Sequence, residues 1–136
     1  MITAVDSNIL LDVLGGDPTF GPVSANALRA ATQEGRLVAC EVVWAEVAGS
    51  FTTAGAAQEA LERLNVEFSA LTVEAALEAG TAWRSYREHG GARTRVTADF
   101  LIGAHALCQA DRLLSRDRGF YRSYFTRLTL LDPSRT

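Results

Sequence analysis

The sequence predicts an α/β fold, a three-layer α/β/α sandwich around a short, mostly parallel, five-stranded sheet. Five short apolar segments alternate along the chain with longer segments whose apolar residues recur at helical spacing. Strands that are apolar throughout are buried on both faces, which is typical of parallel sheets covered by helices on each side. The length of 136 residues suits one domain, so we expect a single domain over residues 1–136.

The first half of the chain begins with an apolar run, Ile2–Val5, that ends at Asp6 and is typical of a buried strand. Glycines at positions 15–16 and 35 follow two segments of helical spacing and end them. The elements expected here are strands at 2–5 and 37–40 and helices at 8–14, 22–34 and 41–51.

The second half contains the most apolar helix, at 97–110, whose apolar residues lie on most sides and indicate a central, buried position. Residues 89–92, His-Gly-Gly-Ala, form the clearest loop. The elements expected here are helices at 58–64, 73–88, 97–110 and 119–124 and strands at 66–71, 112–115 and 128–131.

Composition excludes several function classes. All 13 basic residues are arginine, so phosphate binding by a P-loop lysine, Schiff-base chemistry and a lysine base are excluded. Cys40 and Cys108 lie far apart in apolar context, which indicates two reduced, buried thiols in a cytoplasmic protein and no zinc or disulfide framework. No apolar run reaches the length of a membrane span, and the N-terminus lacks a signal-peptide pattern.

Charge is distributed unevenly between the halves. Residues 1–80 carry 3 arginines and 11 acids, whereas residues 81–136 carry 10 arginines and 5 acids. Such asymmetry indicates a polyanionic partner, or alternatively two halves that pair with each other in the fold.

Acidic residues stand where a parallel sheet directs its chain toward the functional crevice, outside the carboxyl ends of the strands. Asp6 follows the first strand, Asp117 lies just past the fourth, Glu46 is one turn into the helix after the second, and Asp99 is in the first turn of the buried helix. Converging carboxylates are costly without a cation, and Mg²⁺ or Mn²⁺ prefers their oxygens.

Each acid also has a local alternative. Asp6 suits a helix cap, and Asp99 complements a helix dipole in a first turn. Glu46 suits an exposed helix position, and Asp117 suits a turn or a pair with a neighbouring arginine.

Other polar residues are weaker candidates. Asp12 lies on a different helical face from Asp6, and we expect it to be exposed to solvent. His105 is about 240° around its helix from Asp99, so we expect a hydrogen-bonded interior histidine there.

Four segments, in order and over nearly the whole chain, resemble the PIN domain family, and within it the toxin subunits of bacterial VapBC toxin–antitoxin modules. Each segment carries one of the acids. The segments are VDSNILL at 5–11, VWAEV at 43–47, ADFLIGAHA at 98–106 and LLSRDRGF at 113–120.

The resemblance implies a PIN-like fold and a Mg²⁺ or Mn²⁺ site in which four acids are both catalytic and metal-binding: Asp6, Glu46, Asp99 and Asp117. Asn8 and Ser115 match supporting polar positions of the family. Ser7 stands where many relatives carry threonine, a departure that leaves the acids in place.

The implied activity is that of a metal-dependent endoribonuclease toxin, which hydrolyses RNA phosphodiester bonds by activating water at one or two ions. The implied partners are a structured RNA such as tRNA or rRNA, a small VapB-like antitoxin, and a second copy in a homodimer. Arginines beside two of the acids are candidates for holding RNA phosphates, with solvated surface or ion pairs as the alternative: Arg93, Arg95, Arg116 and Arg118.

Two other function classes compete with this one. A phosphoryl-transfer hydrolase with an aspartate nucleophile usually has a second acid two residues on, where Asn8 stands, and a lysine, which is absent. A catalytically silent PIN-like module that binds RNA or protein would be favoured by a missing acid, and none is missing.

Overall fold

A five-stranded sheet forms the centre of the protein in the computed structural model, which describes residues 1–91 and 97–134. The strand order is β3-β2-β1-β4-β5, and all four pairings are parallel. The predicted α/β fold is therefore confirmed. The strands are β1 Ile2–Val5, β2 Arg36–Ala39, β3 Val66–Phe68, β4 Arg112–Leu114 and β5 Leu130–Leu131.

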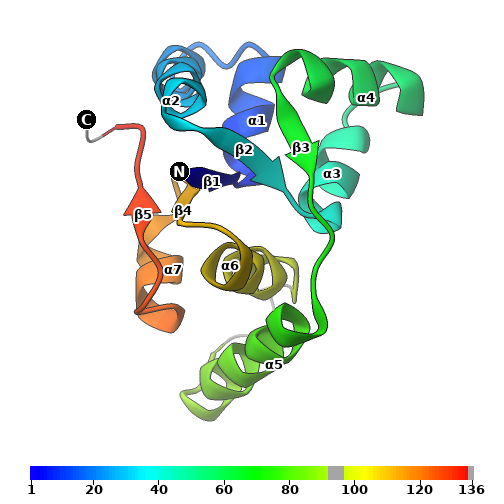
Figure 1. Cartoon of the computed structure of the whole chain (residues 1–136). Helices are drawn as coiled ribbons and strands as arrows, with labels where there is room; N and C mark the ends of the chain where they lie inside the picture. Colours follow the sequence, from blue (N-terminus) through cyan, green and yellow to red (C-terminus); the bar gives the residue numbers. More distant parts are fainter. Residues whose placement is uncertain (92–96, 135–136) are drawn as a thin grey trace.

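Helices cover both faces of this sheet. Figure 1 shows α1, α2 and α4 on one side and α5, α6 and α7 on the other. This arrangement is the predicted three-layer sandwich. The helices are α1 Ser7–Leu14, α2 Gly21–Glu34, α3 Glu41–Ala48, α4 Ala54–Arg63, α5 Val73–Glu88, α6 Thr97–Gln109 and α7 Arg118–Tyr124.

Most element bounds differ from the predicted ones by one or two residues, and the larger differences have local causes. Helix α4 begins four residues early because the Thr53 side chain caps it, accepting a hydrogen bond from the Ala56 amide at 3.1 Å. Helix α3 ends at Ala48 because Gly49 caps it. Strand β3 ends at Phe68 because its partner strand β2 ends at Ala39, the residue paired with Phe68.

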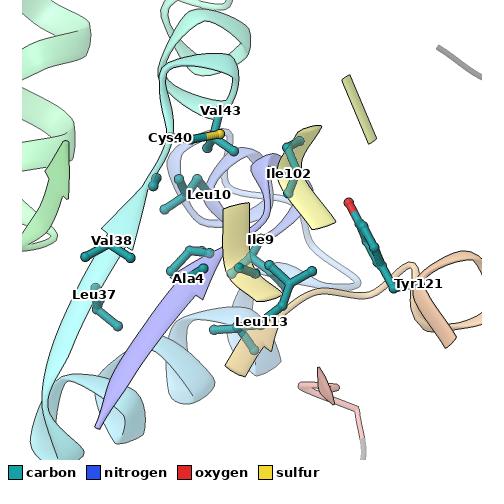
Figure 2. Close-up of a cluster of buried hydrophobic side chains, with 14 of the residues drawn as sticks. Ala4, Ile9, Leu10, Leu37, Val38, Cys40, Val43, Ile102, Leu113 and Tyr121 are labelled. Carbon is teal, nitrogen blue, oxygen red and sulfur yellow. The ribbon is translucent and has the colours of Figure 1, made fainter. Parts of the chain in front are cut away.

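The hydrophobic core lies between the sheet and α1, α3 and α6 (Figure 2). Six residues of α6 are buried, including Phe100 and Ile102, which confirms the predicted central helix. Gly103 allows α6 to approach the end of α7, since a Cβ at this position would lie 2.5 Å from a ring carbon of Phe125. These contacts fix the helix whose first turn carries Asp99.

The carboxyl ends of β1 and β4 meet at the edge of the sheet where the sequence places its acids. The Asp6 amide donates to the Leu114 carbonyl at 3.0 Å, which joins the two strand ends. Strand β1 lies between β2 and β4, and the chain winds away from it in both directions. This switch point is where a parallel sheet opens a crevice.

Two composition-based expectations can be compared with the fold. Cys40 is buried as expected, whereas Cys108 is only partly buried, and both thiols are free. Among the described residues, no helix has the length and apolar character needed to cross a membrane.

Ion pairs account for part of the charge asymmetry. Three arginines of the C-terminal half pair with acids of the N-terminal half: Arg112 with Glu34, Arg116 with Asp12, and Arg127 with Glu78. The alternative interpretation, in which the halves neutralise each other, therefore holds for these three.

Candidate functional site

Asp6 is the centre of the site. It is 3% exposed and follows the central strand β1 directly. Its Oδ1 accepts from the Ser7 amide at 2.7 Å, and its Oδ2 accepts from the Ser115 hydroxyl at 2.8 Å and the Tyr121 hydroxyl at 2.9 Å. Asp6 therefore caps α1 and also occupies the buried centre of the acid cluster, so its local and functional interpretations are compatible.

The surroundings of Asp6 disfavour its negative charge. Burial raises the pKa of the Asp6 carboxyl, hydrogen bonds from Ser115, Tyr121 and Ser7 lower it, and the charge of Asp117 raises it. Burial is the largest of these effects, so the pKa lies above its ordinary value. A carboxylate in this position would be stabilised by a nearby cation.

Ser115 links two of the acids. Its hydroxyl donates to Asp6 and accepts a hydrogen bond from the Asp117 amide at 2.9 Å. Asn8 contacts the same hydroxyl through its side-chain amide at 3.4 Å. Ser115 and Asn8 therefore both lie beside Asp6, while their supporting roles stay predictions, and Asp117 lies near enough to Asp6 to raise its pKa.

Glu46 approaches the cluster from α3. Partial burial raises the pKa of its carboxyl, a hydrogen bond from the Ser7 side chain lowers it, and the charge of Asp6 raises it. The residue as a whole is nevertheless exposed. Glu46 therefore occupies an exposed helix position, and its carboxyl group nevertheless lies within the electrostatic reach of Asp6.

Asp99 and Asp117 both act on the phenol of Tyr121. Tyr121 is fully buried in α7, at the edge of the core cluster in Figure 2. Burial raises the pKa of Tyr121 well above its ordinary range, and the charges of Asp6, Asp99 and Asp117 raise it further. One hydroxyl therefore lies within the electrostatic reach of three predicted site acids, which come from three separate parts of the chain.

Sequence reasoning missed Tyr121. The signal that could have found it is its spacing, four residues after Asp117, which places it one helical turn along α7. Its hydroxyl donates to the buried carboxylate of Asp6, and this contact spans 115 positions of sequence.

The prediction that Asp12 is exposed to solvent is not met. Asp12 is buried, with only 5% of its surface exposed, and its carboxylate accepts hydrogen bonds from Arg116 and Ser24. The expectation was wrong because the partners that bury Asp12 come from α2 and from the loop after β4. His105 is, as expected, a buried interior histidine, with a ring nitrogen 2.9 Å from the Ser69 hydroxyl.

The structure gives different answers for the four arginines predicted to hold RNA phosphates. Arg93 and Arg95 lie outside the described residues. Arg116 forms an ion pair with Asp12 and lies over the Phe20 ring, so the alternative of an ion pair with an acid holds for it. Arg118 is the first residue of α7, and its role toward RNA stays a prediction.

The donor set suits a hard divalent cation, because it consists of carboxylate and hydroxyl oxygens. Two of the acids have raised pKa values, which a cation would lower. Within residues 1–91 and 97–134, however, no three His, Cys, Asp or Glu side chains are close enough together to hold a metal ion as they stand.

A family model described as the PIN domain matches residues 3–125. The chain belongs to the PIN domain family. The resemblance found in the four acid-bearing segments is thereby confirmed, and the buried Asp6 at the end of β1 lies within the matched region of this PIN domain. A comparison with curated proteins gives no match.

Solved structures share the fold of this PIN domain. One is the VapBC2 complex of Rickettsia felis bound to a promoter DNA fragment, with 18% identity, a TM-score of 0.76, and coverage of 97% of this chain and 98% of that chain. VapBC-1 of nontypeable Haemophilus influenzae has 20% identity, a TM-score of 0.75, and coverage of 99% and 100%. A toxin–antitoxin complex of Klebsiella pneumoniae has 18% identity, a TM-score of 0.70, and coverage of 96% and 97%.

Proposed function

We propose that this PIN domain is a VapC-type toxin, a Mg²⁺- or Mn²⁺-dependent endoribonuclease that hydrolyses phosphodiester bonds of a structured RNA such as tRNA or rRNA in the cytoplasm. The observation that carries the proposal is Asp6, a buried carboxylate at the end of the central strand with a raised pKa. Asp117 and Glu46 lie within its electrostatic reach, and the charge of Asp99 acts on Tyr121, which donates to Asp6. Such a cluster is stabilised by a divalent cation.

Four acids would hold the cation: Asp6, Glu46, Asp99 and Asp117. The bound ion would activate water and stabilise the charge that develops on the scissile phosphate. Ser115 and Tyr121 orient Asp6 by donating to its Oδ2, at 2.8 and 2.9 Å. These hydrogen bonds stabilise the ionised form of Asp6 and offset part of the effect of burial.

The partners of the proposed toxin are a VapB-like antitoxin and a second copy of the chain. Support for the antitoxin comes from the fold, which is shared with two VapBC structures and with a further toxin–antitoxin complex. Support for the homodimer comes from α5, where Val73 and Leu77 are 77% and 68% exposed. They lie one turn apart on the helix, so they give apolar surface to a partner. Light scattering of the wild type and Leu77→Arg tests this, and a monomeric wild type would contradict it.

The decisive experiment measures RNA cleavage by the wild type, by Asp99→Asn and by a matched control, Asp111→Asn. Asp111 is exposed and lies beside the amino end of β1, where its Oδ2 accepts from the Ile2 amide. We expect Asp99→Asn to abolish cleavage and to unfold at the same or a higher denaturant concentration, since the change removes a like charge. We expect Asp111→Asn to cleave normally. Full activity of the wild type in EDTA would overturn the proposal.

One observation favours a second function, a catalytically silent PIN module that binds RNA or protein. Among the described residues, no three acids are placed to hold an ion. Calorimetric titration with Mn²⁺ decides between the two functions. Binding that is lost in Asp99→Asn supports the nuclease, and the absence of binding together with the absence of cleavage supports the silent module.

A further inference from the structure

A buried ion pair lies next to the acid cluster. Both oxygens of the Asp12 carboxylate are engaged by Arg116, with Nε 2.7 Å from Oδ2 and Nη2 3.0 Å from Oδ1. The Ser24 hydroxyl donates to Oδ2 at 2.9 Å. Asp12 is 5% exposed, so this carboxylate depends on these protein partners. The two-bond geometry is one that arginine provides and lysine does not.

Arg116 makes two further contacts, one through its guanidinium and one through its backbone amide. Its guanidinium carbon lies 3.9 Å from the centre of the Phe20 ring, and its backbone amide donates to Asn8 Oδ1 at 3.3 Å. Phe20 is itself held, because its amide donates to Asp17 at 2.8 Å. Two guanidinium nitrogens therefore bind Asp12, and one face of the guanidinium packs on an aromatic ring. A side chain held in this way is poorly placed to bind an RNA phosphate.

Arg116 lies in the loop between β4 and α7, so its ion pair with Asp12 fixes the position of this loop. Three residues, 115–117, connect the end of β4 to the start of α7. Ser115, on one side of Arg116, donates to Asp6 at 2.8 Å, and the amide of Asp117, on the other side, donates to the Ser115 hydroxyl at 2.9 Å. The middle residue of this loop is anchored to α1 and to Phe20, the residue before α2, and the residues on either side of it belong to the proposed site.

We propose that Asp12 is a positioning residue, which through Arg116 holds the loop 115–117 so that Ser115 supports Asp6 and the Asp117 amide supports Ser115. The inference rests on the proposed function, and it replaces the prediction that Arg116 binds RNA. A small displacement of a site residue costs roughly 100-fold in rate, and loss of a supporting contact costs about 10–100-fold in metal affinity or activity.

The test compares Asp12→Asn, Arg116→Gln and their double variant with a matched control, Glu67→Gln. The control breaks a bidentate pair of the same kind, because Arg36 bonds both oxygens of Glu67 at 3.0 Å, on the exposed edge of the sheet. Three quantities are measured: kcat and KM for RNA, the Mn²⁺ dissociation constant, and hydrogen exchange of the 115–117 amides.

We expect each single variant to lower kcat about tenfold or more, to change KM less than about threefold, and to raise the Mn²⁺ dissociation constant about tenfold. The double variant should be no worse than either single one, because both changes remove one interaction. Exchange of the 115–117 amides should increase in all three, and Arg116→Lys, which keeps the charge, should recover part of the loss. Glu67→Gln should match the wild type.

Several outcomes overturn the inference. An increase in KM for Arg116→Gln alone, at unchanged kcat, would make Arg116 an RNA-binding residue. Lower stability with unchanged kinetics and Mn²⁺ affinity would make the pair merely structural. If the wild type neither cleaves RNA nor binds Mn²⁺, the proposed function fails, and hydrogen exchange alone still decides whether Asp12 holds the loop. Should Asp12→Asn not fold, Ser24→Ala removes one hydrogen bond of Asp12 and should show the same effects at smaller size.

Discussion

Removing one oxygen atom from the protein, by Tyr121→Phe, tests how much the hydrogen bond from Tyr121 stabilises the Asp6 carboxylate. Tyr121 is fully buried, and its hydroxyl donates to Asp6 Oδ2 at 2.9 Å. The aromatic ring packs against Phe120 and Phe125, with centroids 5.2 and 6.3 Å away, and phenylalanine retains these contacts. The substitution therefore isolates the hydrogen bond.

The expected cost follows from the charge of the acceptor. A hydrogen bond to an ionised group contributes about 1.5–3 kcal/mol, against about 1 kcal/mol for a neutral pair. Asp6 Oδ2 keeps the hydrogen bond from Ser115 at 2.8 Å, so the carboxylate is not left without donors. We therefore expect the free energy of unfolding to fall by about 2 kcal/mol at neutral pH. We also expect the pKa of Asp6 to rise further.

The assay is urea unfolding in EDTA, applied to a double-mutant cycle with Asp6→Asn. In the Asp6→Asn background the cost of Tyr121→Phe should fall to about 1 kcal/mol or less, because the acceptor is neutral. Tyr124→Phe is the matched control, on the same helix and outside the described hydrogen bonds of Asp6. A cost below about 0.5 kcal/mol, or an equal cost in both backgrounds, would refute the reasoning.

Three further predictions concern stability and inhibition. Burial lowers the pKa of His105 below its ordinary value of 6.5, so the unfolded chain binds a proton first, and stability should decrease as the pH falls through 6.5 toward the folded pKa. His105→Gln should flatten this pH dependence and the exposed control His89→Gln should not, as measured by urea unfolding in steps from pH 8 to about pH 5. Gly103→Ala should cost about 1–3 kcal/mol because its methyl group would lie 2.5 Å from the Phe125 ring, whereas Gly55→Ala, with nothing within 4 Å, should raise the melting temperature slightly. The antitoxin should place an arginine or lysine against the site acids, so that its alanine variant binds about 2–5 kcal/mol more weakly in calorimetry, and unchanged inhibition by that variant would contradict this.

Local patterns in the sequence were sufficient to predict the layers of the fold and the places of the acids. An apolar run that ends in Asp6 indicates a buried strand with a carboxylate at its end, and the apolar helix before β4 indicates a central element. These inferences succeed because burial imposes a periodicity on neighbouring residues, and because the carboxyl ends of parallel strands meet at one edge of the sheet. Asp6 and Asp117 could therefore be proposed as neighbours without coordinates, whereas Ser115 was predicted only through the resemblance to the PIN domain family.

The tertiary structure alone decided which polar groups those acids contact. Asp12 is an ordinary helix residue by its spacing, yet it is buried by Arg116, 104 positions away. The spacing of Tyr121 places it one helical turn after Asp117, but only the packed structure shows that its hydroxyl donates to Asp6, 115 positions away. Helical and strand periodicities report which face of an element is apolar, but a buried charge is tolerated or excluded according to partners from other elements. Those partners are brought together only when the sheet and its helices have packed.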